Sequence, residues 1–409
     1  MSLRILHIST RLILGGSQEN TLLSCEGQAR LGHRVHLAFG PIYGPEGSML
    51  QRVRHFELAP GSGQAIRTHE VHSLVRAINP RQDRKCLAEL GRLIRELRPD
   101  VVHTHSSKAG ILGRAAAWKV KQGSMLRRPA VIHTIHGPPF MPVMGNAVAR
   151  KKTELKNHLY TLAERRAAGQ CDRIVSVADS MTEQFLARGI GKPEQYITVR
   201  SGMETGPYLE PEPGQTRTEI RRAAGLGERD FVIGTVARLA EHKGHDDVLD
   251  ALAEPLRANP GWKLLWVGDG WWRPRLMKRV KELGLLGQVV CTGLVEPDKI
   301  PGLVRSMDVL LHPSLREGLP RTVPQAMLSG VPVVATDADG TREACLDGQT
   351  GRLVPVGDAA AIREAVLWMH QNPEERAAMG TRGREITRDE FSAERMVQRL
   401  EEVYADALG

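Results

Sequence analysis

Short apolar runs alternate with helical segments along the whole chain, and no other feature limits its fold as strongly. The first half contains LRILHIST, RVHLAF, DVVHTHS, AVIHTIHG, RIVSVAD and ITVRSGM, with helical segments that include 88–97, 111–121 and 157–168. The second half repeats the pattern with DFVIGTVA, WKLLWVG, QVVCTG, DVLLHPS, VPVVAT and GRLVPVGD. Strands that alternate with helices pair in parallel and use the helices as crossovers. The alternation therefore predicts an α/β protein with two Rossmann-like domains in tandem.

The length also favours two domains, because 409 residues exceed the size at which a single core stops growing. The Pro- and Gly-rich segment 210–215 (EPEPGQ) is typical of a linker, and 393–407 has the pattern of an amphipathic helix. We place the domain boundary close to this linker, so that the domains span 1–200 and 201–389.

The composition excludes several classes of protein. Apolar residues are 41% and charged residues 25%, which is ordinary for a globular enzyme and unlike a disordered, collagenous or coiled-coil chain. Segment 129–149 lacks charges but contains four prolines and two histidines, so it does not predict a bilayer-spanning helix. Residues 1–10 are too short and too alternating for a signal peptide. The five scattered cysteines (25, 86, 171, 291 and 345) form no disulfide framework or CxxC clip, which favours the reducing cytoplasm.

The positive charge is concentrated in the first half. The net charge of +9 divides into +14 for residues 1–199 and −5 for residues 200–409. A basic half suggests a polyanionic partner such as nucleic acid or an anionic membrane face. Aromatic residues are only 4%, so few side chains could stack on bases, and we expect no nucleic-acid partner. The alternative interpretation is an ordinary basic surface that binds no partner.

Two motifs follow predicted strands and suit phosphate binding. Gly15 and Gly16 precede a helix, where they would let a phosphate approach the helix N-terminus. They match neither GxGxxG nor a P-loop, and a simple tight turn would use the same residues. In RLAEHKG, Arg238 and Lys243 follow a predicted strand, and their two positive charges are suited to bind a diphosphate. The alternative interpretation is a solvated turn without a ligand.

The segment 308–343 carries the most information. A strand ends at HPS, Glu317-Gly318-Leu319 is predicted as a loop, and Pro320 is predicted to open a helix. Backbone N–H groups near Gly318 and Leu319 could bind phosphate, with Glu317 and Gln325 beside it.

Together these motifs resemble the retaining GT-B glycosyltransferases of family 4, the glycosyl transferases group 1. That family marks its donor site with two glutamates separated by seven residues, and Glu317 and Gln325 occupy these positions. GGS at 15–17, RLAEHKG at 238–244, VGDG at 267–270 and GTRE at 340–343 match in the same order. Two departures concern donor handling: Gln325 replaces the second glutamate, and SGME at 201–204 replaces the more usual NGVD.

The resemblance implies two Rossmann-like domains that face each other across a cleft, with a C-terminal helix at about 390–409 packing back on the first domain. The first domain would bind the acceptor and the second the nucleotide sugar. The expected activity is transfer of a hexose or N-acetylhexosamine, with retention, from a UDP-sugar to a glycan or polyprenyl-diphosphate-linked acceptor in bacterial polysaccharide synthesis. A nucleotide-sugar epimerase or hydrolase and a non-catalytic sugar-nucleotide-binding protein are the alternatives.

The resemblance also implies roles for individual residues. Arg238 and Lys243 would neutralise the donor diphosphate, and Glu317 would hold hydroxyls of the donor sugar. His136 would lie near the reacting centre, and Gln325 would face the ribose. The other donor-binding residues that it implies are Gly15, Gly16, Gly268, Gly318, Leu319, Thr341 and Glu343. The leaving diphosphate would accept the acceptor's proton, so stabilising its charge would supply most of the catalysis.

We expect no metal ion or other cofactor. Asp337-Ala-Asp339 is a DxD motif, which binds metal in the other glycosyltransferase fold. Here it follows a strand of the second domain, and the motifs of the chain come in the GT-B order, so we do not interpret it as a metal site. His103 and His105 share one strand face, whereas His133 and His136 do not, and no carboxylate or cysteine accompanies them at ligand spacing. Trp271-Trp272 is interpreted as packing, with an exposed contact as the alternative.

The segment 137–156 joins apolar PPFMPVMGNAVA to basic ARKKTELKNH, and more cations (Lys119, Lys121, Arg127 and Arg128) lie upstream. Apolar residues beside a basic cluster suit a membrane surface. We therefore expect Arg150, Lys151 and Lys152 to contact the acceptor or an anionic membrane, at the inner face of the plasma membrane. A loop packed on its own domain beside a solvated helix is the alternative.

Overall fold

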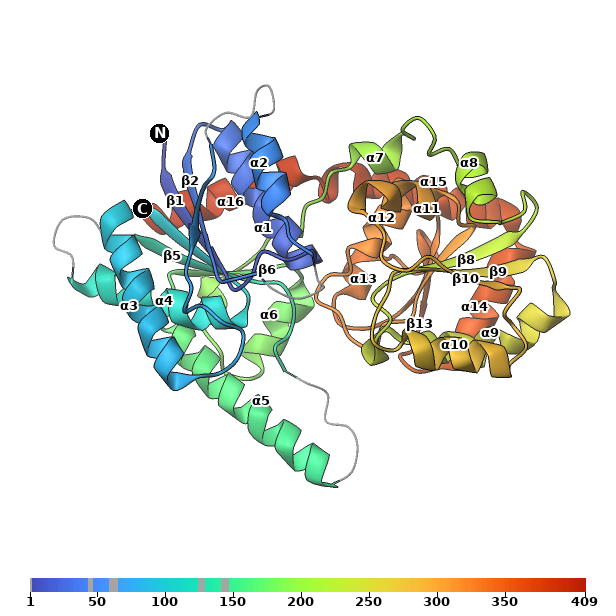
Figure 1. Cartoon of the computed structure of the whole chain (residues 1–409), viewed down its shortest axis with the longest axis horizontal. Helices are drawn as coiled ribbons and strands as arrows, with labels where there is room; N and C mark the ends of the chain where they lie inside the picture. The colour runs from blue at the N-terminus through green and yellow to red at the C-terminus, as the bar shows by residue number, and fades with distance from the viewer. Residues whose placement is uncertain (1, 43–46, 59–64, 124–128, 141–146) are drawn as a thin grey trace. The chain divides into compact units, whose positions relative to one another are not determined.

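The computed structural model describes residues 2–42, 47–58, 65–123, 129–140 and 147–409. The chain forms two compact units, which we call the N-terminal unit (Met1–Met203 with Ala393–Gly409) and the C-terminal unit (Glu204–Ser392). Each unit is a sheet with helices packed on both of its faces (Figure 1). The parallel, helix-covered sheets confirm the predicted α/β fold class.

Within the described residues, the N-terminal unit has a seven-stranded parallel sheet in the order β3-β2-β1-β4-β5-β6-β7. Its strands are β1 (Arg4–Ser9), β2 (Arg34–Phe39), β3 (Arg67–Glu70), β4 (Val101–His105), β5 (Ala130–Ile135), β6 (Arg173–Ser176) and β7 (Tyr196–Thr198). The strand order reverses between β1 and β4, which is the point where doubly wound sheets bind ligands.

The N-terminal unit contains α1 (Gly16–Arg30), α2 (Leu50–Leu58), α3 (Pro80–Leu97), α4 (Ser107–Gly123), α5 (Ala147–Ala168), α6 (Asp179–Leu186), α16 (Ala393–Leu408) and the 3₁₀ turn η1 (Pro193–Gln195). α3 begins at Pro80, before the predicted residue 88. The Asn79 side chain accepts hydrogen bonds from the N–H groups of Arg81 (3.1 Å) and Gln82 (3.3 Å), which caps the helix at this point. β3 was not predicted, because its sequence RTHE is polar and mostly exposed at the edge of the sheet.

α16 packs on the sheet of the N-terminal unit, although it lies at the end of the chain. Met396, Leu400 and Tyr404 are buried in one cluster with Ile5 of β1 and Val101 of β4. The same helix packs on α1, where a Cβ at Gly27 would lie 2.5 Å from the Val397 side chain. Residues from opposite ends of the sequence therefore share one hydrophobic core.

Within the described residues, the C-terminal unit has a six-stranded parallel sheet in the order β10-β9-β8-β11-β12-β13. Its strands are β8 (Phe231–Val236), β9 (Trp262–Val267), β10 (Val289–Cys291), β11 (Val309–His312), β12 (Val333–Thr336) and β13 (Gly351–Val354). Its helices are α7 (Gly206–Leu209), α8 (Arg217–Ala223), α9 (His245–Ala258), α10 (Arg273–Glu282), α11 (Ile300–Arg305), α12 (Thr322–Leu328), α13 (Thr341–Ala344), α14 (Ala359–Gln371) and α15 (Pro373–Glu390), with 3₁₀ turns η2 (Glu241–Lys243) and η3 (Pro297–Lys299).

The segment 210–215 is a loop inside the C-terminal unit, so its interpretation as a linker is wrong. Arg384 of α15 donates to the carbonyl oxygen of Leu209, and Arg305 of α11 donates to that of Gln215 (3.3 Å). These bonds fix the backbone on both sides of the Pro- and Gly-rich residues. The units divide earlier, between Met203 and Glu204.

No helix in the described part of the chain is both long enough and apolar enough to cross a bilayer.

We expect the packing of α16 to be essential for the N-terminal unit. Leu400→Ala should lower the free energy of unfolding by about 2–5 kcal/mol, because it leaves a cavity in a buried cluster. Leu408→Ala, at an exposed position of the same helix, should change it by less than about 0.5 kcal/mol. Urea unfolding followed by circular dichroism measures both variants, and equal effects would contradict this account of α16.

Candidate active site

Lys243 and Glu317 meet at the carboxyl ends of two neighbouring strands of the C-terminal unit. Lys243 lies in η2 after β8, Glu317 follows β11, and these strands pair in parallel. Lys243 Nζ donates a hydrogen bond to Glu317 Oε1, and His312 Nε2 lies 3.1 Å from the same oxygen. The Lys243 and Glu317 side chains are only 19% and 13% exposed. The fold thus brings a predicted cation and a predicted carboxylate into direct contact.

The surroundings of Glu317 keep its carboxylate ionised. Burial by itself would raise the pKa of Glu317, but the charge of Lys243 and the hydrogen bond and charge from His312 outweigh it, so that the pKa is strongly lowered. Oε1 carries these contacts, while Oε2 has no hydrogen-bond partner within the part of the chain described. The site therefore presents a fixed anionic oxygen that can accept hydrogen bonds from hydroxyl groups.

Close backbone contacts hold the two loops together. Gly244 has φ +69°, and a Cβ there would lie 2.0 Å from the carbonyl oxygen of Pro313. The N–H of Leu315 donates to the carbonyl oxygen of His242 (2.9 Å). Only glycine allows this approach of the loop after β8 to the loop after β11.

Gly268 lets the loop after β9 pack closely against the backbone next to Arg238. Its φ is +139°, and a Cβ would lie 2.2 Å from the carbonyl oxygen of Ala237, so the VGDG loop packs against the backbone beside Arg238. Arg238 is exposed, and its guanidinium carbon lies 5.9 Å from the ring centre of Trp271.

Trp271 is itself 65% exposed, so its interpretation as packing is wrong, whereas Trp272 packs on the core. Trp272 is the N-cap residue of α10, and Trp271 precedes it in the loop.

The helix after Glu317 begins at Thr322 and not at Pro320 as predicted. Its first backbone hydrogen bond joins the N–H of Gln325 to the carbonyl oxygen of Arg321 (3.2 Å), so Pro320 lies before it. Gly318 and Leu319 are buried in the preceding loop. The Gln325 side chain is half-buried and makes no hydrogen bond with any described residue.

Two buried hydroxyl groups lie in the loops of this site. Thr341 Oγ1, at the start of α13, and Ser314 Oγ, after β11, have no hydrogen-bond partner among the described atoms. Glu343 is half-buried in the same short helix. Buried polar groups normally have a partner, so unpaired ones in a loop region are suited to contact a ligand.

Both carboxylates of the DxD motif bond to protein groups. Asp337 accepts from Arg342 Nε (2.9 Å) and Nη2 (2.6 Å). Asp339, with φ +47°, accepts from the N–H of Glu317 (2.7 Å) and thereby fixes the Glu317 loop. These contacts give both residues a structural role that needs no metal ion.

In the N-terminal unit, one residue of the GGS motif, Ser17, lines the same cavity as His136, and the predicted Gly15 and Gly16 are not among the lining residues. Gly15 caps α1 and Gly16 is its first residue. Ser17, in the first turn of α1, lines a cavity of about 360 Å³ together with His136, which follows β5, and Ser106, which follows β4. The structure therefore brings the start of α1 and the loop after β5 to the same space.

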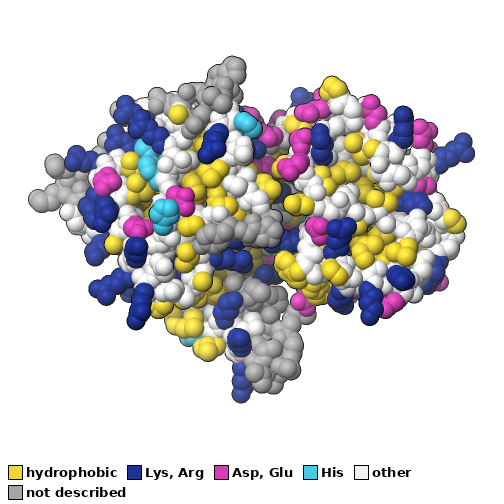
Figure 2. All heavy atoms as spheres, in the orientation of Figure 1, with side chains coloured by type: hydrophobic (Ala, Val, Ile, Leu, Met, Phe, Trp, Pro, Cys, Tyr) yellow, Lys and Arg dark blue, Asp and Glu magenta, His cyan; other side chains and the backbone are white. Residues whose placement is uncertain are grey.

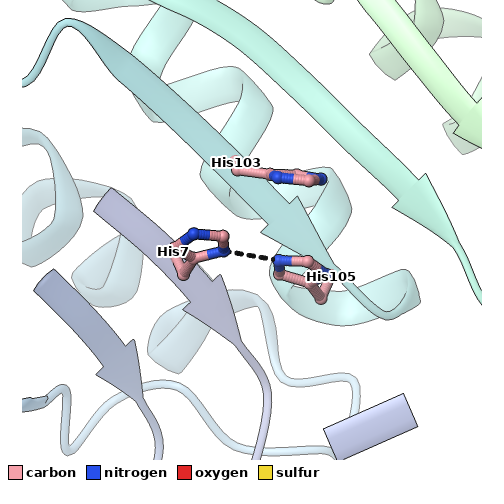
Figure 3. A group of neighbouring side chains, drawn as sticks. All are labelled: His7, His103 and His105. Carbon is pink, nitrogen blue, oxygen red and sulfur yellow. Dashed lines mark hydrogen bonds between the residues drawn. The ribbon is translucent and has the colours of Figure 1, made fainter. Parts of the chain in front are cut away.

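His7, His103 and His105 form the group of described residues whose side chains could hold a metal ion, with ligand atoms within 4.8 Å of one another (Figure 3). His7 was not among the predicted site residues. The sequence carries no local signal for it, because His7 joins the group only through the pairing of β1 with β4, which sets it opposite His103. Ring nitrogens of all three residues already make hydrogen bonds, to Gln28, Tyr404, Thr134 and one another.

Arg150, Lys151 and Lys152 are exposed on α5. Leu155, Leu159 and Leu162 of this helix are 62%, 58% and 46% exposed. Figure 2 shows Lys and Arg side chains spread over the visible face of the N-terminal unit. The apolar residues 141–146, Arg127 and Arg128, which the prediction also used, lie outside the described residues.

Two family models match the chain. "Glycosyl transferase 4-like domain" matches residues 15–202, and "Glycosyl transferases group 1" matches residues 216–386. Putative glycosyltransferase EpsD of Bacillus subtilis is 27% identical over 320 residues, which are 78% of this chain and 79% of that protein. UDP-Gal:alpha-D-GlcNAc-diphosphoundecaprenol alpha-1,3-galactosyltransferase of Escherichia coli is 26% identical over 311 residues, 74% of each chain.

Solved structures share the fold. Anabaena HepE, crystallised in complex with UDP, superposes with a TM-score of 0.77 at 19% identity, covering 99% of this chain and 100% of that one. This similarity shows that the fold is GT-B.

We expect Glu317 to contribute stability that depends on pH. The folded-state pKa of Glu317 is lowered, so its contribution is fully present above the unfolded pKa of about 4.3 and is lost as the pH falls below it. Glu317→Gln should lower the free energy of unfolding by about 2 kcal/mol at pH 7 and by progressively less below about pH 4.5.

Thermal unfolding between pH 3 and pH 7 measures this difference. Glu282→Gln removes a partner of the exposed pair with Lys278 and should change stability by less than about 0.5 kcal/mol at any of these pH values. A difference for Glu317→Gln that stays constant down to pH 3 would contradict the ion-pair assignment.

Proposed function

Because the chain belongs to the glycosyl transferases group 1 and is a glycosyltransferase, we propose that it transfers a hexose or N-acetylhexosamine, with retention, from a UDP-sugar to a glycan or polyprenyl-diphosphate-linked acceptor. The relative from Escherichia coli supports this choice, because its name gives a UDP-sugar donor and a diphosphoundecaprenol acceptor. The HepE complex with UDP supports the same nucleotide.

The observation that carries the proposal is the contact of Lys243 with Glu317 at the ends of β8 and β11. A lysine that is held by a buried carboxylate is pre-oriented, so its charge needs little reorganisation when a diphosphate leaves. Arg238, which is exposed and lies five residues before Lys243, supplies a planar group for bidentate contact with phosphate oxygens. Glu317 Oε2 then accepts hydrogen bonds from hydroxyls of the donor sugar.

The other residues of the C-terminal unit complete donor binding. The backbone N–H groups of Gly318 and Leu319 and the hydroxyl of Thr341 donate to phosphate oxygens. Gln325 contacts the ribose through its amide, and Gly268 and Glu343 shape the remaining wall of the site. In the N-terminal unit, Gly15 and Gly16 offer backbone to the phosphates, and His136 acts beside the acceptor.

The proposed reaction needs no metal ion. Two protein cations and backbone N–H groups supply the positive charge that a metal would bring to the diphosphate. The diphosphate oxygens accept the proton of the attacking hydroxyl. No general base from the protein is then required.

We expect Arg238→Ala and Lys243→Ala each to lower kcat by about two to three orders of magnitude, the cost of removing one preorganised stabilising group. Lys278→Ala, which removes an exposed cation of α10, should leave kcat unchanged. Release of nucleoside diphosphate from UDP-sugars, measured in EDTA with a panel of lipid-linked and free glycan acceptors, tests the proposal. Near wild-type rates in both site variants would overturn the assignment.

The same assay separates the alternatives. A transferase releases nucleoside diphosphate only when acceptor is present, whereas an epimerase or hydrolase consumes the donor without it. A binding protein releases none. If EDTA abolishes activity and Mn²⁺ restores it, Asp337 and Asp339 would become candidate metal ligands of the reaction.

We further propose that the N-terminal unit contacts the inner face of the plasma membrane through α5, where a lipid-linked acceptor would be found. Arg150, Lys151 and Lys152 lie near the start of the helix, and the exposed Leu155 and Leu159 follow on the same helix four residues apart. Cations beside exposed apolar side chains match the headgroup and acyl layers of an anionic bilayer.

Charge reversal of Arg150, Lys151 and Lys152 to Glu should weaken binding to phosphatidylglycerol-containing vesicles by about 100-fold or more, because each cation contributes about 1 kcal/mol. Reversal of three exposed lysines of the C-terminal unit, Lys278, Lys281 and Lys299, is the matched control and should have little effect. Co-sedimentation at low salt measures both. Failure of the wild type to sediment would remove the membrane proposal and leave the transferase proposal intact.

A further inference from the structure

A chain of hydrogen bonds runs through the core of the N-terminal unit and ends at His136. His136 Nε2 lies 3.1 Å from His105 Nδ1, His105 Nε2 lies 2.9 Å from His7 Nδ1, and His7 Nε2 lies 2.8 Å from Gln28 Oε1. Figure 3 shows the contact between His7 and His105. His7 and Gln28 are fully buried and His105 is 2% exposed. Four side chains, from two strands, the loop after a third strand and one helix, thus form one linear network.

Strand register explains why these histidines meet. His7 of β1 pairs with His103 of β4, and His105 lies two residues further along the same face. β5 pairs with β4, and His136 lies two residues beyond Thr134, which pairs with His105. All of them are therefore on the face of the sheet that α1 and α16 cover. Gln28 reaches this face from α1.

Gln28 fixes the direction of every hydrogen bond in the chain. Its amide oxygen can only accept, so His7 Nε2 must donate, and a neutral His7 then accepts at Nδ1. His105 therefore donates from Nε2 and accepts at Nδ1, and His136 donates from Nε2. The result leaves Nδ1 as the only nitrogen of His136 that can accept a hydrogen bond.

Burial supports neutral rings within the chain. The pKa of His7 is lowered to about 4 by burial, against a smaller raising effect of the Gln28 hydrogen bond. The pKa of His105 is lowered well below its usual value by burial and then by the neighbouring histidines. Neutral imidazoles with one donor and one acceptor each are what a directional chain requires.

We propose that His105 and His7, anchored by Gln28, are positioning residues that hold His136 as its Nε2–H form and direct its Nδ1 lone pair to a substrate hydroxyl. The inference rests on the proposed function only in assigning His136 to the reaction. His136 lines the cavity that also contains Ser17 and Ser106, so a sugar hydroxyl in this space would find an acceptor of fixed orientation.

The test reads the tautomers directly. In the full-length protein labelled with ¹⁵N-histidine, long-range ¹H–¹⁵N spectra without substrate should show His7, His105 and His136 as Nε2–H forms. Gln28→Met, which keeps a similar volume but removes the amide acceptor, should let His136 populate the Nδ1–H form. Gln28→Glu, which retains the acceptor, should restore the Nε2–H form of His136.

Kinetics provide the second measurement. Gln28→Met should lower kcat by about five- to tenfold with little change in the KM of the nucleotide sugar, the loss expected when one hydrogen bond of the transition state is missing. Gln28→Glu should recover kcat. His36→Gln is the matched control, because it breaks another hydrogen bond between histidines, to His69 (2.9 Å), at the edge strands β2 and β3.

Several results would overturn the proposal. One is an Nδ1–H form of His136 in the wild type, and another is a tautomer of His136 that Gln28→Met leaves unchanged. A third is tightly bound Zn²⁺ in the purified protein, found by elemental analysis, since a metal on His7, His103 and His105 would use the nitrogens of the chain. The tautomers of the wild-type protein can be measured without a variant and without enzymatic activity. A protein that is inactive but shows the expected tautomers would therefore contradict the proposed function and leave the histidine network intact.

Discussion

Parallel strand pairing is the constraint on which the rest of the structure depends. Parallel strands need crossover helices, and these return every strand in the same direction, so all carboxyl ends of a sheet lie at one edge. In the C-terminal unit this edge carries the loops that contain Lys243, Glu317 and Asp339. In the N-terminal unit it carries Ser106 and His136. Residues far apart in sequence become neighbours because they follow neighbouring strands.

Burial of charge then decides which of these neighbours interact. A carboxylate as buried as that of Glu317 is costly unless partners compensate it, and Lys243 and His312 provide this compensation. Arg114 and Glu164 form a similar pair in the N-terminal unit, 2.6 Å apart and almost fully buried, which joins α4 to α5. Such pairs stabilise only the arrangement that brings both partners together. They therefore fix the positions of the loops and helices that carry them.

The fold class and the order of the motifs were predictable from the sequence. Period-two and period-3.6 patterns are local, and they placed β1, β2, β4 and β8 and the helices α14 and α16 to within a few residues. These patterns failed to predict an element where its sequence has too few apolar residues to show a regular spacing. α15 was missed because its sequence is largely polar, although glycine lets it pack closely: a Cβ at Gly380 would lie 2.1 Å from the carbonyl oxygen of Gly330. The start of α12 was misplaced because a proline permits a helix start without determining it.

The sequence by itself determined that this chain forms two parallel α/β sheets and that glycines and cations follow particular strands, because those signals lie within about ten residues of one another. Only the tertiary structure decided that Lys243 bonds to Glu317, 74 residues away, and that His7 joins His105 across 98 residues. Both contacts depend on which strands are neighbours and in what register. Register becomes fixed only when the apolar faces of whole strands and helices pack together, because a shift of one residue would turn every side chain of a strand to the other face.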